Sequence, residues 1–212
     1  MKCKICNYPT KLWEDTQLKK RYFYCSHCHC ICLDSAYYLT LEKEHSLYNN
    51  HRNSLENAGY VKMFEDFLDF FWNDLACKEK ALDFGSGPTP VLSQLLANRG
   101  IQVDYYDKFY QPIKCFEHQT YDVITSTEVF EHLDNPNETL KLLTQHLKPN
   151  GIIALMTLFH GDDQAHFFTW WYRRDPTHII FYTPKTLEIL ARQCGLEVVK
   201  TDGKRIAVLQ KR

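Results

Sequence analysis

One short stretch limits the fold of this chain more than any other part. Residues 81–92 begin with apolar positions, reach Asp83, turn at Gly85 and Gly87, and pass through two prolines into a helical pattern. Glycine allows the positive φ angles of a tight turn, and it lets a ligand approach the backbone because it has no Cβ. Proline suits the first turn of a helix, where a missing N–H has no cost. The stretch therefore predicts a strand, a turn and a helix N-terminus that binds a nucleotide-like cofactor.

The class of cofactor follows from two positions in this stretch. A dinucleotide-binding turn has the order G-x-G-x-x-G, and Pro90 stands where its third glycine would be. The carboxylate of Asp83 is poorly placed for a pyrophosphate but suits a cationic ammonium and sulfonium. The order D-x-G-x-G resembles the cofactor loop of class I S-adenosylmethionine-dependent methyltransferases, with Thr89 at the family's looser third glycine. The resemblance implies four cofactor-binding residues in this loop: Asp83, Gly85, Ser86 and Gly87.

A second strand is predicted over residues 101–107, and it ends in an acidic residue, Asp107. Its separation from the glycine turn matches a helix-and-return unit, which puts this carboxylate where the ribose hydroxyls of the cofactor would lie. Tyr106 and Phe109 are candidates to flank the adenine. The next clear strand, 121–125, follows so soon that the family's usual third strand does not fit in between, and we expect that strand to be missing or vestigial.

Residues 126–133 follow this strand, and in the resembled family the matching residues line the cofactor and acceptor pocket. Thr127 and Glu128 match cofactor-side positions. Glu128 and His132 are four residues apart, which places them on one face of a helix. His132 is therefore a candidate to take a proton from a methyl acceptor, with Glu128 and His178 as further candidates. A surface histidine beside an acidic residue is the alternative interpretation.

The segment 158–182 is rich in aromatic, histidine and paired charged residues. We expect it to form a lid over the strand ends, where open α/β sheets bind ligands. Its candidate substrate-binding residues are Tyr172, Arg173 and His178. The aromatic ring offers a stacking surface, and an arginine clamps a carboxylate or a phosphate. A local ion pair between Arg173 and Asp175 that holds the loop is an equally good interpretation.

The remaining periodicity predicts an α/β domain over residues 57–212. Apolar residues at three- and four-residue steps, with caps and terminating glycines, predict helices over 57–75, 91–97, 135–146 and 184–194. Strands are predicted over 152–157, 196–200 and 205–210. The closing helix and hairpin are similar to the family's reversed last strand. We therefore expect a doubly wound, Rossmann-like and mostly parallel sheet with an antiparallel last strand, and we expect Tyr60 near the cofactor.

The N-terminal 36 residues carry a second pattern. Two Cys-x-x-Cys pairs supply four thiols: Cys3, Cys6, Cys25 and Cys28. Four thiolates at this spacing close a tetrahedral zinc site, with a hairpin of two short strands between the pairs. His27, His29, Cys30 and Cys32 are alternatives to Cys28, and free buried cysteines are the alternative to a metal site. We expect a structural zinc ribbon over 1–36 and a linker over 37–56, because a closed four-cysteine site has no open coordination position.

Length, composition and net charge limit the classes of protein to which this chain can belong. The chain has 212 residues, enough for one α/β domain and a small appendage, with 44% hydrophobic and 24% charged residues. The formal net charge of −1 gives no electrostatic footprint for nucleic acid. Nine cysteines without an export signal or a membrane-spanning stretch indicate a reducing cytoplasm.

These observations predict an S-adenosylmethionine-dependent methyltransferase that acts on a small molecule, a metabolite or a glycan. Two alternatives stay open. An RNA methyltransferase would use the ribbon to grip RNA, although RNA-binding proteins usually have a basic surface. A non-catalytic scaffold would bind a partner through the ribbon. A nicotinamide-dependent dehydrogenase is disfavoured by Pro90.

Overall fold

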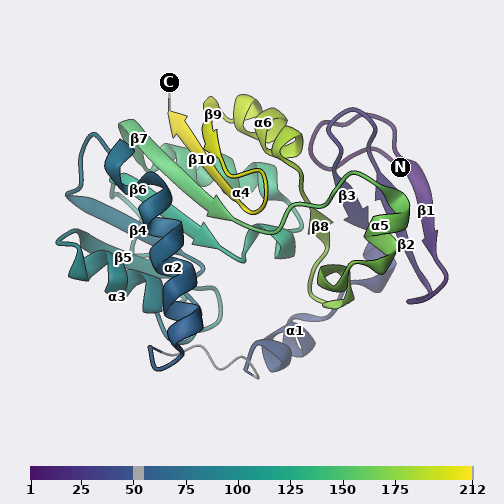
Figure 1. The fold of residues 1–212 in the computed structure, drawn as a ribbon, viewed down its shortest axis with the longest axis horizontal. Helices are drawn as coiled ribbons and strands as arrows, with labels where there is room; N and C mark the ends of the chain where they lie inside the picture. Colours follow the sequence, from purple (N-terminus) through teal and green to yellow (C-terminus); the bar gives the residue numbers. More distant parts are fainter. Residues whose placement is uncertain (50–54, 212) are drawn as a thin grey trace.

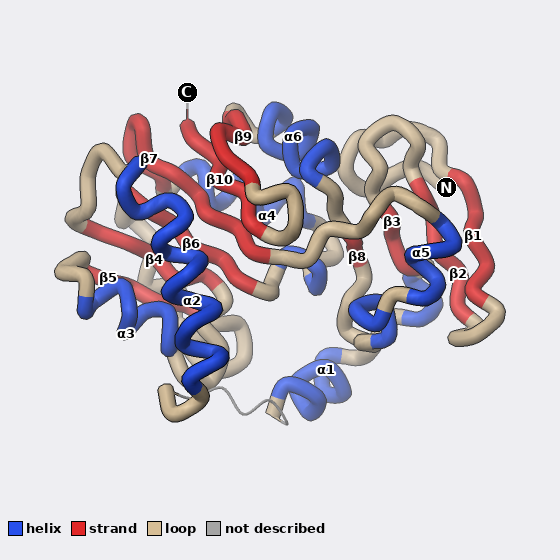
Figure 2. Tube along the Cα trace, in the orientation of Figure 1, coloured by secondary structure: helices blue, strands red, loops and turns tan. Residues whose placement is uncertain are grey.

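Two β-sheets organise the molecule. The structure is a computed structural model that describes residues 1–49 and 55–211. A six-stranded sheet forms the larger part and a four-stranded sheet the smaller part. Figure 1 shows the strands of the N-terminal region at the right end of the molecule and the larger sheet at the left, and Figure 2 shows the same arrangement by element type.

The large sheet has the mixed topology that the sequence predicts. In spatial order its strands are β5 (Gln102–Tyr106), β4 (Lys80–Phe84), β6 (Tyr121–Thr127), β7 (Leu147–Met156), β10 (Ile206–Lys211) and β9 (Leu196–Thr201). β5, β4, β6 and β7 are parallel, and β10 runs antiparallel to both of its neighbours. Within the described residues no strand lies outside β5, and the chain from Lys108 to Thr120 makes turns and one isolated bridge. The expectation of a missing third strand is confirmed.

Helices cover both faces of this sheet because neighbouring strand residues point to opposite sides. The helices are α2 (Ala58–Phe71), α3 (Val91–Asn98), α4 (Pro136–Gln145) and α6 (Pro184–Gln193). Ala81, Val123 and Ile152 pack with the apolar residues of α2 and α3. Their chain neighbours Leu82, Ile124 and Ile153 belong to the other core, with the apolar residues of α4 and α6. This is the doubly wound arrangement predicted from the sequence.

Residues 37–49 are more ordered than the predicted linker. The structure has a 3₁₀ turn η1 (Ser35–Tyr37) and a helix α1 (Leu41–Tyr48) there. Thr40 begins α1, since its side chain accepts a hydrogen bond from the Lys43 N–H. The apolar periodicity of this helix is weak and none of its residues is buried, so hydrophobic spacing does not predict it. Residues 50–54 of the predicted linker lie outside the described part of the chain.

The small sheet joins the N-terminal region to residues 180–181, far along the chain. Its strands are β1 (Lys11–Asp15), β2 (Lys20–Tyr24), β3 (Ile31–Leu33) and β8 (Ile180–Phe181). β1 and β2 form the predicted hairpin, and β3 pairs with β8 through Ile31 opposite Phe181 and Cys32 opposite Ile180. The predicted lid therefore supplies a strand to the sheet of the N-terminal region.

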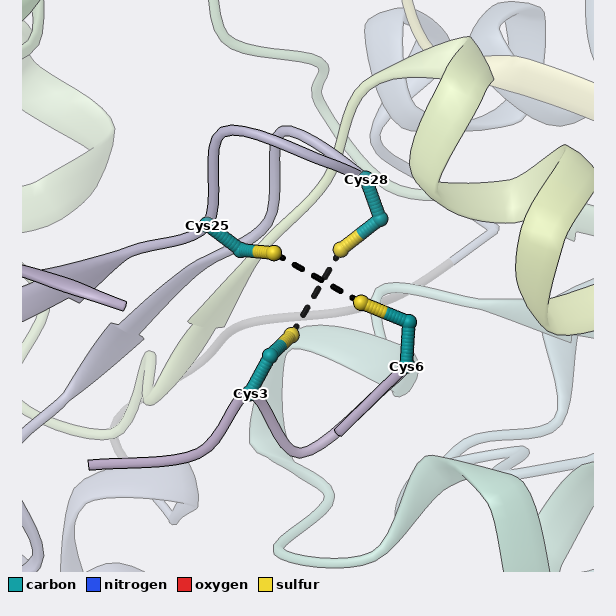
Figure 3. A group of neighbouring side chains, drawn as sticks. All are labelled: Cys3, Cys6, Cys25 and Cys28. Carbon is teal, nitrogen blue, oxygen red and sulfur yellow. Dashed lines mark hydrogen bonds between the residues drawn. The ribbon is translucent and has the colours of Figure 1, made fainter. Parts of the chain in front are cut away.

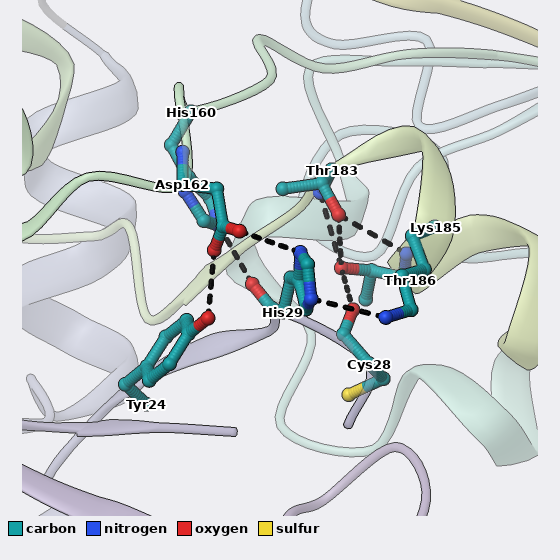
Figure 4. A network of polar contacts seen from close by, with 8 residues as sticks. All are labelled: Tyr24, Cys28, His29, His160, Asp162, Thr183, Lys185 and Thr186. Carbon is teal, nitrogen blue, oxygen red and sulfur yellow. Dashed lines mark hydrogen bonds and ion pairs between the residues drawn. The ribbon is translucent and has the colours of Figure 1, made fainter. Parts of the chain in front are cut away.

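A polar network adds to this connection (Figure 4). The His29 ring lies 2.7 Å from the Asp162 carboxylate, which also accepts a hydrogen bond from the Tyr24 hydroxyl at 2.9 Å. His160 Nε2 lies 2.8 Å from the His29 carbonyl, and Thr186 Oγ1 donates to the Cys28 carbonyl at 2.8 Å. The loop around the second cysteine pair is thus tied to residues 160–162 and to the first turn of α6.

Arg173 corrects a prediction. We expected it to clamp a substrate, or to pair with Asp175, but its side chain is fully buried between the lid and the β1–β2 hairpin. Arg173 Nη2 lies 3.4 Å from Asp15 Oδ2, and it donates to Gln17 Oε1 at 2.6 Å and to the Phe168 carbonyl. Asp175 instead accepts hydrogen bonds from Thr177. A fully buried guanidinium needs a carboxylate, and the nearest one belongs to the hairpin.

We expect the variant R173M to be destabilised by about 3–5 kcal/mol, because it leaves the Asp15 carboxylate buried without its cation. Urea unfolding followed by tryptophan fluorescence measures this change. R174M is the matched control, since Arg174 is exposed, and its effect should stay within about 0.5 kcal/mol. Equal midpoints for the two variants would show that the buried ion pair does not hold the lid to the hairpin.

Candidate functional site

A cavity of about 500 Å³ opens at the carboxyl ends of the central parallel strands. Its walls come from the glycine turn after β4, the ends of β5 and β6, the helices α1 and α2, and residues 171–178 of the lid. This is the edge at which open α/β sheets bind ligands. Tyr60 of α2 lines the cavity as the sequence predicts, and Tyr48 of the unpredicted helix α1 lines it as well.

The glycine turn forms one wall. Gly85 and Gly87 have φ angles of 89° and 68°, the left-handed values expected for a turn that only glycine adopts easily. A Cβ on Gly85 would lie 2.2 Å from Val129 Cγ2, so this glycine is needed for close packing. A Cβ on Gly87 would meet nothing within 4 Å, and Gly87 lines the cavity. Gly87 therefore leaves room for a ligand against the backbone.

The N–H groups of this turn are bonded to the end of β5. The N–H groups of Gly85 and Ser86 donate to the Tyr106 carbonyl at 2.8 Å and 3.1 Å. The Gly87 N–H donates to Asp107 Oδ2 at 3.0 Å. The turn is thereby held against the end of β5, and its shape no longer depends on a bound ligand.

Asp107 lies at the end of β5, on the cavity wall. Its Oδ1 accepts hydrogen bonds from the N–H groups of Phe109 and Tyr110 at 2.8 Å and 3.1 Å. A carboxylate offers about four acceptor positions, so three backbone donors fix its orientation and leave capacity for a ligand hydroxyl. Tyr106, also on the wall, stacks on Phe84 with ring centroids 5.2 Å apart.

Asp83 is buried at the edge of the cavity. Its carboxylate accepts hydrogen bonds from Ser93 Oγ at 2.8 Å and from Thr125 Oγ1 at 3.3 Å. Burial raises the pKa of Asp83 to about 6, although the two hydroxyls favour the charged form. Near pH 7 the group is mostly ionised and offers a negative charge in a poorly solvated place.

Two carboxyl groups, those of Glu128 and Glu131, follow the end of β6. Glu128 lines the cavity, and Glu131 lies fully buried beside it. The Tyr172 hydroxyl contacts Glu128 Oε2 at 3.0 Å and also donates to Glu131 Oε1. Burial raises the pKa of both carboxyl groups, and the negative charge of Glu128 raises that of Glu131 further. Glu131 was not predicted from the sequence, although a second acid three residues after Glu128 was a usable signal.

Two histidines also line the cavity. His132 Nδ1 lies 3.0 Å from the Thr177 carbonyl, and His178 Nδ1 lies 2.8 Å from the Tyr172 carbonyl. Their ring centroids are 4.8 Å apart. Burial and the neighbouring His178 lower the pKa of His132 to about 3, so its ring is neutral near pH 7.

The expected helical face of Glu128 and His132 is not present. Glu128 has a φ of 53°, and only Phe130–His132 forms a single 3₁₀ turn, η3. The two residues reach one wall because this turn and the lid pack together. One ligand atom from each of Glu131, His132 and His178 lies within 4.8 Å of the others, so this group is able to hold a metal ion.

Of the predicted site residues, most reach the cavity and Arg173 does not. The residues on its walls are Asp83, Gly85, Ser86, Gly87, Tyr106, Asp107, Thr127, Glu128, His132, Tyr172 and His178. They come from the glycine turn, the strand ends and the lid, as expected. Arg173 is buried against the β1–β2 hairpin instead.

The four predicted metal ligands also come together (Figure 3). The Sγ atoms of Cys3, Cys6, Cys25 and Cys28 all lie within 4.8 Å of one another, and Cys3–Cys28 and Cys6–Cys25 are each separated by 3.5 Å. A tetrahedral zinc with Zn–S bonds of about 2.3 Å places its sulfurs about 3.8 Å apart, so the cluster fits such an ion. Cys30 and Cys32 lie outside this group, with Sγ atoms 3.6 Å apart.

Comparison with protein families gives a match over most of this chain. A family model described as "Methyltransferase domain" matches residues 52–201. The N-terminal cysteine cluster lies outside the match. None of the helices in residues 1–49 and 55–211 is both long and apolar enough to cross a membrane.

Curated relatives are similar over part of their length. The "Ubiquinone biosynthesis O-methyltransferase" of Saccharophagus degradans is 31% identical over 87 residues, which are 41% of this chain and 36% of that protein. The protein of the same name from Rickettsia canadensis is 26% identical over 113 residues, 49% of this chain and 47% of that protein. The chain thus spans about a third to a half of the length of the curated relatives it matches.

Solved structures share the fold at low identity. The magnesium protoporphyrin IX methyltransferase of Synechocystis PCC 6803, with bound SAH (S-adenosylhomocysteine), has a TM-score of 0.54 and 12% identity, over 81% of this chain and 94% of that one. A methyltransferase of calicheamicin biosynthesis in its SAH-bound form has a TM-score of 0.56 and 15% identity, over 81% of this chain and 59% of that one. With a family match over more than half of its length, the chain belongs to the methyltransferase-domain family.

Proposed function

We propose that the chain is an S-adenosylmethionine-dependent methyltransferase whose methyl acceptor is a small molecule that binds in the cavity between the glycine turn and the lid. The observation that carries this proposal is the cavity itself. Its volume of about 500 Å³ is within the range for small-molecule sites. Aromatic rings from α1, α2 and the lid line it, together with polar groups from the glycine turn, the strand ends and the lid. The names of the ubiquinone biosynthesis relatives support an acceptor of this class.

The cofactor wall suits S-adenosylmethionine residue by residue. Asp107 is oriented to accept hydrogen bonds from the ribose hydroxyls, with Tyr106 beside the adenine. Asp83 provides negative charge for the cationic end of the cofactor, and Gly87 leaves space for it. The other predicted cofactor-binding residues on the cavity wall are Ser86, Thr127 and Glu128. When bound, the cofactor supplies a methyl group that a sulfonium already activates.

The part of the cavity wall formed by Glu128, His132, Tyr172 and His178, here called the acceptor wall, would act on the proton of the acceptor. An alcohol or phenol must lose its proton as its oxygen takes the methyl group, and Glu128 and His178 are the cavity residues placed to accept it. His132, whose pKa is lowered to about 3, would orient the acceptor through a hydrogen bond. Tyr172 fixes the carboxyl groups of that wall. The protein otherwise needs to align the acceptor and exclude water, and the lid residues stand where they would do both.

We propose further that Cys3, Cys6, Cys25 and Cys28 hold a structural zinc ion. Its role is support of the lid, because the loop after Cys28 bonds to residues 160–162 and β3 pairs with β8. The Cys28 carbonyl also accepts a hydrogen bond from the Thr186 hydroxyl in the first turn of α6. A zinc ribbon so deeply joined to the lid has less surface available for RNA or a partner protein, which makes the RNA methyltransferase and the scaffold the weaker alternatives.

D107A should weaken binding of S-adenosylhomocysteine by roughly ten-fold or more, because the ribose loses its acceptor and the turn loses the bond from Gly87. Isothermal titration calorimetry measures this affinity. D104A is the control on the same strand, since Asp104 bonds to Tyr121 and Lys80 and is not on the cavity wall. If D107A binds as tightly as the unaltered protein, the ribose assignment is wrong.

S-adenosylmethionine affinity should fall as the pH drops from 7.5 to 5. The folded pKa of Asp83 is raised to about 6, so this carboxylate loses its charge through pH 6 instead of near pH 4. At pH 5 the Asp83 carboxyl group would be protonated in about nine-tenths of the molecules, which limits the loss of affinity to about ten-fold. The difference should disappear in D83N. An equal pH dependence in both proteins would remove Asp83 from cation recognition.

H132N should lower the turnover number by about a hundred-fold or more while S-adenosylmethionine affinity stays unchanged, because His132 lies on the acceptor wall. The measurement is S-adenosylhomocysteine formation with a panel of hydroxylated aromatic molecules, and with total RNA as the rival acceptor. H146N is the control, since His146 lies away from the cavity. Methylation of RNA but of no small molecule would overturn the proposed acceptor class.

A further inference from the structure

We propose that helix α1 is a positioning element of the cofactor site, because it holds the loop Lys108–Tyr110, which in turn holds Asp107. The inference rests on the proposed function, in which Asp107 accepts hydrogen bonds from the ribose hydroxyls. It assigns a role to three residues of α1 and its C-cap that contact this loop: Glu44, His45 and Asn49.

The first observation is how little else supports this loop. Between Asp107 and β6 the chain forms neither a helix nor a strand, and all of these residues are described. Two backbone hydrogen bonds between Asp107 and Gln111, of 3.1 Å and 3.0 Å, close the base of the loop. The N–H groups of Phe109 and Tyr110, at its tip, orient Asp107 Oδ1. Because β5 is the edge strand, the tip depends on another element for support.

The second observation is that α1 reaches both ends of this tip. Glu44 Oε1 lies 2.6 Å from Lys108 Nζ, and Asn49 Oδ1 accepts a hydrogen bond from the Tyr110 hydroxyl at 2.8 Å. Glu44 stands in the first turn of α1 and Asn49 is its C-cap, so the two contacts span the whole helix. The helix and the loop are thereby held parallel contact by contact, and neither end of the tip is left without a partner from α1.

The third observation is the packing on Phe109, the middle residue of the tip. The His45 ring stacks on the Phe109 ring, with centroids 4.7 Å apart and an interplanar angle of 11°. Lys108 Nζ, which Glu44 holds, lies 4.6 Å from the centroid of the same ring. Stacked rings and a cation over a ring are both attractive arrangements. The residue whose N–H bonds to Asp107 is therefore fixed by two side chains that α1 supplies or holds.

The exposure of α1 shows that core packing does not explain its position. None of its residues is buried, and Leu41 and Leu47 are 68% and 36% exposed. In Figure 1 the helix lies at the lower edge of the molecule, apart from the strands of both sheets. A helix of eight residues is not stable by itself in water. Its contacts with the loop and with the cavity wall therefore account for its place in the structure.

Tyr48 extends these contacts to the acceptor wall. It lines the cavity, and its ring centroid lies 5.8 Å from that of Phe109 and 5.4 Å from that of His132. The helix thus connects the loop after β5 with η3 at the cavity wall. A cofactor that binds Asp107 in this orientation also favours the docked position of α1, because the coupling between two such events is reciprocal.

A charge exchange between α1 and the loop tests the proposal. Isothermal titration calorimetry measures S-adenosylhomocysteine binding to E44K, K108E and the double variant E44K/K108E. We expect each single variant to bind about five-fold more weakly, since like charges replace an ion pair. The double variant should return to within about two-fold of the unaltered protein. E42K is the matched control, because Glu42 is exposed in the same helical turn, and it should bind normally.

A double variant that binds as weakly as K108E would overturn the proposal, because Lys108 would then act on the cofactor directly. The His45 ring provides a second pair of variants, should E44K fail to fold. H45A should weaken binding by about five-fold, whereas H45F keeps a ring against Phe109 and should bind within about two-fold of the unaltered protein. An equal loss in both would reject the stacking role.

Hydrogen exchange separates a failure of this inference from a failure of the proposed function. In the unaltered protein, S-adenosylhomocysteine should slow amide exchange in residues 41–48, and this slowing should be smaller in E44K. No binding of S-adenosylhomocysteine to the unaltered protein would reject the proposed function. Binding that leaves the exchange of α1 unchanged, with equal affinity in E44K, would reject the role of α1 alone.

Discussion

The site depends on how the glycine turn is fastened to the neighbouring strand. Gly85 and Ser86 donate to the last carbonyl of β5, and Gly87 donates to Asp107 just after it. The three bonds make the turn and the acidic residue one rigid unit before any ligand is present. A site organised in this way spends little binding energy on ordering itself. The same bonds explain why both glycines have positive φ and why Asp107 points into the cavity.

The lid is held from the other side by the N-terminal region. A strand pair, a buried ion pair and a polar network all connect residues 160–181 to the β1–β2–β3 sheet. Tyr172 and His178 lie within the same lid segment, on the cavity wall. The four-cysteine cluster in the first 28 residues is therefore connected to a part of the cavity wall that lies far along the chain. The cysteine cluster and the cavity are thus connected through the contacts between the lid and the N-terminal region.

Local patterns allowed much of this to be predicted. The strand, turn and helix of residues 81–92, the acid at the end of β5 and the two cysteine pairs all lie where spacing places them. The missing strand followed from a length argument that needs no contacts. Helix α1 escaped because it buries no stripe, and the turn at Glu128–His132 was misread as a helix because a four-residue spacing does not by itself establish helical backbone.

The sequence alone determined the cofactor wall, because steric and hydrogen-bonding preferences act over a few neighbouring residues and leave their mark in composition and spacing. Only the tertiary structure decided the acceptor wall. Arg173 does not reach the cavity, because a buried guanidinium needs a carboxylate beside it. That carboxylate belongs to Asp15, in a hairpin near the N-terminus. Glu131, His132 and His178 meet because the lid packs on η3. Such pairings depend on which distant surfaces are buried together, and no local pattern records them.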